Sequence, residues 1–112
     1  MSKHKQDPRR ANGRAYQRDQ LRKRVLAAYD TCAICGRPID KTLKTPHPMS
    51  PEVDEIIPVS RGGNPIDWHN VQLVHRCCNR MKSNHSNRWA IDKAHGRPAA
   101  KPSSMPFQTV GI

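Results

Sequence analysis

Apolar residues recur at helical spacing near the start of the chain. Between residues 14 and 30 they fall roughly on one side, and Arg and Lys fill the other: Tyr16, Leu21, Val25, Leu26, Ala28 and Tyr29. This pattern predicts an amphipathic helix over residues 14–30. Residues 75–92 contain neither Pro nor Gly, which predicts a second helix there.

Two short apolar runs between these helices predict strands. The first is Val53–Ser60, which Pro58 interrupts or ends, and the second is Val71–Val74. A glycine turn at residues 61–64 follows the first run, and four prolines mark residues 37–52 as a loop. The pattern predicts a small α+β fold.

The composition is too polar for a self-sufficient core. Hydrophobic residues make up 35% of the 112 residues, below the ~45–50% of an ordinary globular domain. Such a small domain needs a stabilising cross-link such as a bound metal, and the four Cys and six His offer ligands for one. No apolar run approaches the ~18 residues of a membrane span. The start of the chain is charged and lacks the apolar stretch of a signal peptide. We therefore expect a reducing compartment, where Cys residues serve as metal ligands rather than in disulfides.

The charge is concentrated at the ends of the chain. The net charge is +11, and residues 1–24 hold nine Lys and Arg against two Asp. A concentrated basic arm attracts a polyanion such as nucleic acid, although a solvated tail would have the same composition. We expect a disordered basic arm at residues 1–13, one domain at 14–92 and a flexible tail at 93–112.

Two pairs of metal-ligand residues share the same spacing. Cys32 and Cys35 form a CxxC followed by Gly36, and His75 and Cys78 are likewise separated by two residues. Zinc prefers four such ligands in a tetrahedron, so the two pairs predict a structural zinc site.

The neighbouring Cys77 is an alternative ligand to Cys78. The two-residue spacing from His75 favours Cys78 and leaves Cys77 as a spare thiol.

Oxygen ligands lie between and just after the zinc pairs. Asp54 and Glu55 are adjacent carboxylates, and Asn79 follows the second pair. Mg²⁺ takes one or two protein ligands together with water, so Asp54 with Asn79 would suit it. Each residue also has an ordinary interpretation, as a solvated carboxylate or a helix cap. Arg80 and Lys82 follow within the predicted helix, where we expect them to contact phosphates.

Four motifs in order resemble those of the zinc-containing HNH endonucleases. They are CxxC, V-D-x-I-I-P-x-S-R-G-G, D-x-x-N-x-Q-L and H-x-x-C-N-x-x-K, and they cover residues 25–85. The resemblance implies a ββα-metal (HNH/His-Me finger) domain with a zinc knuckle, in which a hairpin and a helix enclose a divalent ion. It makes Asp54 and Asn79 the ligands of a catalytic Mg²⁺ or other divalent cation.

The resemblance also assigns the remaining site residues. Asn70 would orient the loop and the general base by hydrogen bonds. Glu55 stands where the family usually has a His base, and it is the preferred base here; it could instead be a further metal ligand, with His69 an alternative base. His75 replaces a Cys that most members place in the zinc site.

These features predict a metal-dependent endonuclease that hydrolyses DNA phosphodiester bonds with low sequence specificity. The residues expected to bind DNA are Arg18, Arg22, Arg61, Arg80 and Lys82. Two rival hypotheses are a non-catalytic zinc-stabilised DNA-binding module and a protein-interaction adaptor.

The compact size and basic arm are similar to those of bacteriophage HNH proteins. This similarity implies a role in phage genome processing or packaging, with terminase or other packaging proteins as partners. It also implies the cytoplasm of a bacterial host and no membrane partner. The chain would act as a monomer or weak dimer.

Overall fold

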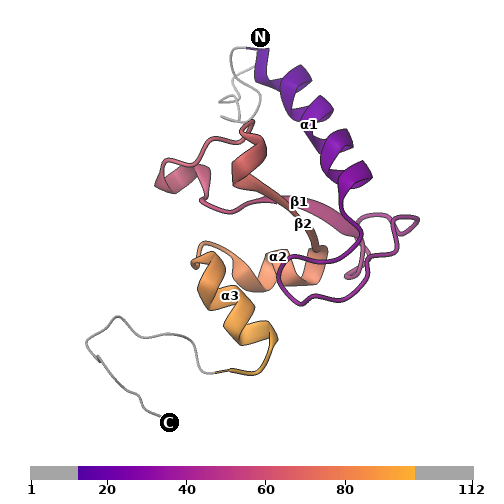
Figure 1. Ribbon diagram of the computed structural model, residues 1–112, viewed down its shortest axis with the longest axis vertical. Coiled ribbons are helices and arrows are strands. Elements are labelled where there is room, and N and C mark those ends of the chain that lie inside the picture. Colours follow the sequence, from indigo (N-terminus) through magenta and orange to yellow (C-terminus); the bar gives the residue numbers. More distant parts are fainter. Residues whose placement is uncertain (1–12, 98–112) are drawn as a thin grey trace.

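The computed structural model describes residues 13–97, which form a small α+β domain (Figure 1). Its helices and strands are, in order, α1 (Arg14–Ala28), β1 (Pro51–Glu55), β2 (Val71–His75), α2 (Arg76–Lys82) and α3 (Asn87–Ala94). The predicted arm, except Gly13, and most of the predicted tail lie outside the described residues. None of the described helices has the length and apolar character needed to cross a membrane.

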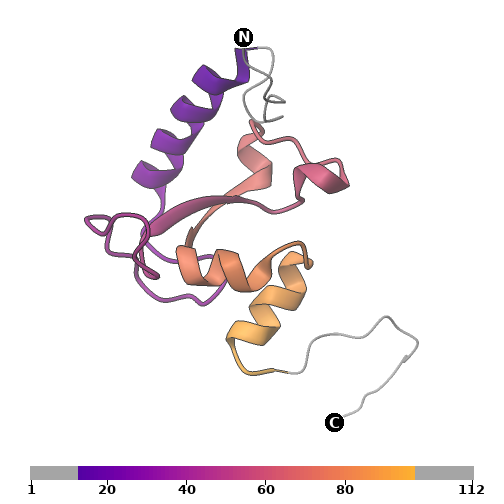
Figure 2. The same ribbon diagram turned by 180° about the vertical axis from the view of Figure 1, so that it is seen from behind.

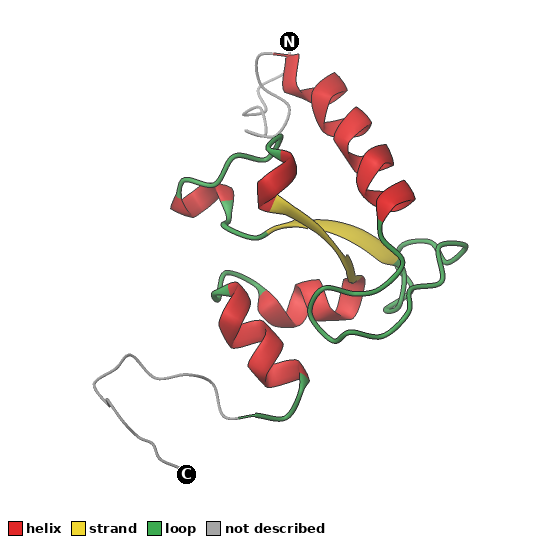
Figure 3. Cartoon of the chain, in the orientation of Figure 1, coloured by secondary structure: helices red, strands yellow, loops and turns green. Residues whose placement is uncertain are grey.

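The two strands form an antiparallel hairpin, drawn in yellow in Figure 3. Pro51 pairs with His75 at one end and Glu55 with Val71 at the other. β1 begins earlier than the predicted Val53 and ends before Pro58. The chain then turns through a short 3₁₀ helix at Val59–Arg61, because Pro58 cannot donate to a strand ladder.

The hairpin lies between α1 on one side and the α2–α3 pair on the other, as Figures 1 and 2 show from opposite directions. Side chains alternate along a strand, so each side receives its own residues from β1. Glu52 and Asp54 bond to α2, whereas Glu55 pairs with Arg18 of α1. The hairpin and α2 make the ββα unit that the sequence predicts.

The core is small and packs around the hairpin. Its buried hydrophobic residues come from most of the elements and from the loop after α1: Leu21, Val25, Cys32, Ile34, Ile39, Val71, Leu73, Val74, Cys78 and Ala90. The predicted apolar face of α1 is only partly correct. Leu21 and Val25 are buried, but Tyr16 is 70% exposed and Tyr29 is 42% exposed.

The single helix predicted over residues 75–92 is wrong. α2 ends at Lys82, and Ser83 takes a positive φ of 49°, which a continuing helix does not allow. α3 then starts afresh, with the Ser86 hydroxyl accepting from Trp89 N–H at 3.0 Å. α3 runs to Ala94, so the predicted domain boundary at residue 92 falls inside a helix.

Candidate metal centres

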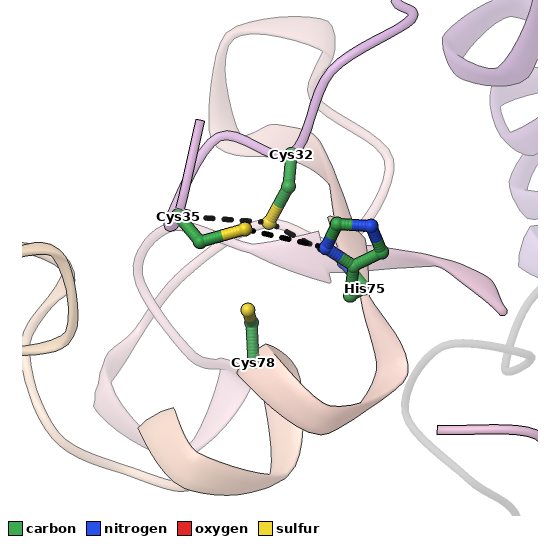
Figure 4. Close-up of side chains that lie close together, drawn as sticks. All are labelled: Cys32, Cys35, His75 and Cys78. Carbon is green, nitrogen blue, oxygen red and sulfur yellow. Dashed lines mark hydrogen bonds between the residues drawn. The ribbon is translucent and has the colours of Figure 1, made fainter. Parts of the chain in front are cut away.

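Three Cys and one His gather where β2 meets α2 (Figure 4). The ligand atoms of Cys32, Cys35, His75 and Cys78 all lie within 4.8 Å of one another. The first two come from the loop after α1, His75 ends β2, and Cys78 lies in the first turn of α2. This Cys₃His set fits the tetrahedral preference of zinc, and it is the set predicted from the paired spacing.

Neighbouring backbone groups orient the ligands. His75 Nε2 donates to the Pro38 carbonyl at 3.2 Å, which leaves Nδ1 as the ligand atom, 3.3 Å from Cys35 Sγ. The backbone N–H groups of Ile34, Cys35 and His75 donate to Cys32 Sγ at 3.4 Å. The knuckle turns through Gly36, whose φ of +80° suits glycine.

The pKa values of two thiols in this cluster are shifted in opposite directions. Burial raises the pKa of Cys32, but the backbone N–H donors outweigh burial and leave that pKa below its ordinary value. Burial, followed by the charges of Cys32 and Cys35, raises the pKa of the Cys78 thiol well above its ordinary value. A divalent cation would relieve this repulsion, because it binds the deprotonated ligands.

Cys77 lies outside this cluster. Its thiol is exposed and contacts Met49 Sδ at 3.7 Å. The preference for Cys78 over Cys77 is therefore correct, because α2 turns Cys78 inward and its neighbour outward.

A second polar cluster joins the hairpin to α2. Lys82 Nζ donates to Asp54 Oδ2 at 2.7 Å and to the Glu55 carbonyl at 2.8 Å. Gln72 Nε2 donates to the same Asp54 oxygen at 2.9 Å. Lys82 is completely buried, so its predicted contact with DNA phosphates is wrong: the ammonium is used inside the protein.

Asn79 lies on α2, one helical turn before Lys82, and also bonds to β1. Its Nδ2 donates to Glu52 Oε1 at 2.8 Å, and Arg76 Nε lies 3.5 Å from Glu52 Oε2. Sequence reasoning missed Glu52 because the family motif does not include it. The signal was the two-residue spacing from Asp54, which puts both carboxylates on one face of β1.

Asp54 and Asn79 thus lie on adjoining elements, the first on β1 and the second on α2. In the described part of the chain, hydrogen bonds to their side chains involve only Asp54 Oδ2 and Asn79 Nδ2. Each side chain keeps one oxygen, Oδ1, for another partner. A carboxylate and an amide oxygen are suitable ligands for Mg²⁺ or Mn²⁺.

Glu55 faces the other side of the hairpin. It is 5% exposed, and its Oε2 lies 3.0 Å from Arg18 Nη2. Arg18 also donates to the carbonyls of Pro65 and Val53, at 3.1 and 3.2 Å. The predicted DNA contact at Arg18 is not supported, because its side chain is 12% exposed and joins α1 to the hairpin.

Asn70 holds the loop that follows β1. It accepts from Ile57 N–H at 2.9 Å and donates to the carbonyls of Ile57 and Asn64. Gly63 passes so close that a Cβ there would lie 1.7 Å from the Ile57 carbonyl oxygen. The predicted orientation of the loop by Asn70 agrees with these contacts.

The other residues predicted to touch DNA remain on the surface. Arg22, Arg61 and Arg80 are exposed. His69, the alternative base, has a side chain that is 90% exposed and lies 3.6 Å from Asp67.

A family comparison agrees with this architecture. Residues 32–85 match the model of the family described as HNH endonuclease. Neither the curated proteins nor the solved structures include a significant match to the chain. The matched segment contains the hairpin, α2 and the Cys₃His cluster, which are the parts of a ββα-metal domain. Over residues 32–85, just under half of its length, the chain therefore contains a domain that matches the HNH endonuclease family.

Proposed function

We propose that the protein is a metal-dependent endonuclease that hydrolyses DNA phosphodiester bonds with low sequence specificity. The observation that carries the proposal is the placement of Asp54 on β1 and Asn79 on the adjoining helix α2, each with one oxygen outside the hydrogen bonds that join these two elements. These are the two positions at which the family motif places its metal ligands.

Asp54 and Asn79 would hold a divalent cation such as Mg²⁺ or Mn²⁺ together with water. When bound, the cation would supply a Lewis acid that offsets charge developing on the phosphate. Lys82 and Gln72 hold the Asp54 carboxylate through Oδ2, which leaves Oδ1 as the oxygen that would bind the cation.

Glu55 is proposed as the acceptor of a proton from the attacking water. Its motif position supports this role. Its side chain lies on the face of β1 opposite Asp54, which argues against a second carboxylate ligand to the same cation. Arg18 fixes the carboxylate at the end of β1, and Asn70 fixes the loop that begins there.

DNA contacts are proposed for Arg22, Arg61 and Arg80, all of which are exposed. Cations of this kind bind the phosphate backbone, so they give affinity that falls with salt and little base discrimination. We expect substitution of each arginine to weaken binding similarly for unrelated DNA sequences, as measured by gel shift.

Plasmid cleavage by the zinc-loaded chain tests the proposed activity. Nicking should require Mg²⁺ or Mn²⁺ and stop when EDTA is added. Asn79→Ala should abolish it, whereas Asn84→Ala, an exposed Asn just after α2, should not. Glu55→Gln should slow cleavage about 10²–10⁴-fold, as expected for loss of a general base.

The variants also separate the candidate bases. If Glu55→Gln cleaves normally and His69→Ala does not, the base is His69. Cleavage by Asn79→Ala at the normal rate, with zinc content and circular dichroism unchanged, would sink the metal-site assignment.

A non-catalytic DNA-binding module is the second candidate. The burial of Glu55 beneath Arg18 favours it, because this carboxylate is only 5% exposed. The module predicts salt-dependent DNA binding with no cleavage in any divalent metal.

A role in phage genome processing or packaging rests on the similarity of this compact basic chain to phage HNH proteins. It predicts that a terminase would bind the chain or change its cleavage rate. Sedimentation at several concentrations would test the expected monomer or weak dimer.

A further inference from the structure

Glu52 is a carboxylate on β1 that contacts α2 and to which the family motif assigns no role. Asp54 lies two residues along β1, so both side chains leave the strand on the α2 side. The Glu52 side chain is 24% exposed, and both of its oxygens face partners on α2.

The hydrogen bond between Glu52 and Asn79 determines which atom of the Asn79 amide points toward Glu52 and which points away from it. An ionised carboxylate only accepts hydrogen bonds, so it selects Nδ2 and repels Oδ1. Glu52 Oε1 accepts from Nδ2 at 2.8 Å. Because the amide group is planar, engaging Nδ2 on one side turns Oδ1 toward the other.

Arg76 pairs with the other Glu52 oxygen by charge, without a hydrogen bond from its Nε. Its Nε lies 3.5 Å from Oε2, and both side chains are largely covered, at 20% and 24% exposure. With Oε1 bonded to Asn79 and Oε2 beside Arg76, Glu52 has partners for both oxygens, as expected for a supporting residue rather than a ligand.

We propose that Glu52 is a positioning residue that orients Asn79 Oδ1 toward a divalent cation. The inference rests on the proposed function, because it assumes that Asn79 is a metal ligand. Lys82 and Gln72 hold Asp54 by one oxygen in the same way. Partners of this kind fix ligand geometry, and their loss typically weakens metal affinity about 10–100-fold.

Two substitutions distinguish positioning from direct ligation. Glu52→Ala removes the acceptor, whereas Glu52→Gln keeps a carbonyl oxygen that can accept from Asn79. Asp40→Asn is the matched control, because it removes an exposed carboxylate whose side-chain hydrogen bonds, among residues 13–97, are to Thr42. Each variant is studied zinc-loaded, so that the fold is held constant.

The measurements are Mn²⁺ affinity by titration calorimetry and the Asn79 side-chain amide signals by NMR without Mn²⁺. We expect Glu52→Ala to weaken Mn²⁺ binding about tenfold or more and to shift the Asn79 amide signals. Glu52→Gln should retain most of the affinity, and Asp40→Asn should change neither measurement.

Two results would overturn the proposal while leaving the endonuclease function intact. Unchanged Mn²⁺ affinity in Glu52→Ala would mean that Glu52 does not orient Asn79. Equal, large losses in Glu52→Ala and Glu52→Gln would make Glu52 a ligand itself. If the unsubstituted chain neither binds Mn²⁺ nor cleaves DNA, the proposed function fails and this inference fails with it.

Discussion

The buried ion pair of Lys82 with Asp54 is the most constrained contact at the scale of single residues. The two side chains are 0% and 10% exposed, and the Lys82 ammonium also reaches the carbonyls of Glu55 and Ile56. Breaking a buried pair by removing one partner typically costs about 3–5 kcal/mol, because the other charge stays buried. Lys82 therefore stabilises the packing of α2 against β1 at Asp54.

Lys82→Met should lower the free energy of unfolding by about 3–5 kcal/mol. Urea unfolding of the zinc-loaded chain measures this change. Arg80→Met is the control: it removes a positive charge from an exposed position of the same helix, and it should cost less than about 0.5 kcal/mol. The double variant Asp54→Asn, Lys82→Met should recover part of the loss, and equal costs for Lys82→Met and Arg80→Met would show that the pair contributes little.

At the scale of elements, the loop after β1 depends on a close approach that only glycine permits. A Cβ at Gly63 would meet the Ile57 carbonyl oxygen at 1.7 Å and Asn70 Nδ2 at 2.8 Å. Asn70 bonds to both backbone groups of Ile57, so any shift of the loop would disturb the end of β1. The second Gly of the R-G-G motif is thus required by packing.

Gly63→Ala should destabilise the domain by about 1–3 kcal/mol, the usual cost of overpacking. The adjacent Gly62 provides the comparison, because its φ is +92° but no atom lies within 4 Å of an added Cβ. Gly62→Ala tests only the backbone conformation, which costs about 1 kcal/mol. Thermal unfolding of the two zinc-loaded variants checks the order, and a smaller cost at Gly63 would contradict the packing argument.

At the scale of the whole molecule, the Cys₃His cluster joins parts of the chain that lie far apart in the sequence. The cluster ties the loop after α1 to the junction of β2 and α2. In the part of the chain that the structure describes, the core contains ten buried hydrophobic residues, two of them cysteines of this cluster. Metal binding free energy becomes folding free energy in such small domains.

Removal of zinc should therefore unfold the domain. Adding a strong chelator is expected to abolish most of the helical circular dichroism, and adding zinc back should restore it. Cys78→Ser should lose zinc, whereas Cys77→Ser should bind one zinc per chain as before, because Cys77 lies outside the cluster. Retention of the helical signal without zinc would show that the core suffices alone.

Local spacing in the sequence determined much of this protein. The Cys32/Cys35 and His75/Cys78 pairs predicted the metal cluster, and the ordered motifs predicted the ββα unit. Such features are readable because ligands separated by two residues reach one ion with little help from the rest of the fold.

The tertiary structure alone decided which polar residues face inward. Lys82 and Arg18 look like surface cations in the sequence, yet one is buried against Asp54 and the other against Glu55. Likewise, the residues between Lys82 and Asn87 contain no Gly or Pro, but the chain breaks there into two helices. The physical reason is that the burial of Lys82 and Arg18 depends on partners far away along the chain, and periodicity within one segment does not record such partners.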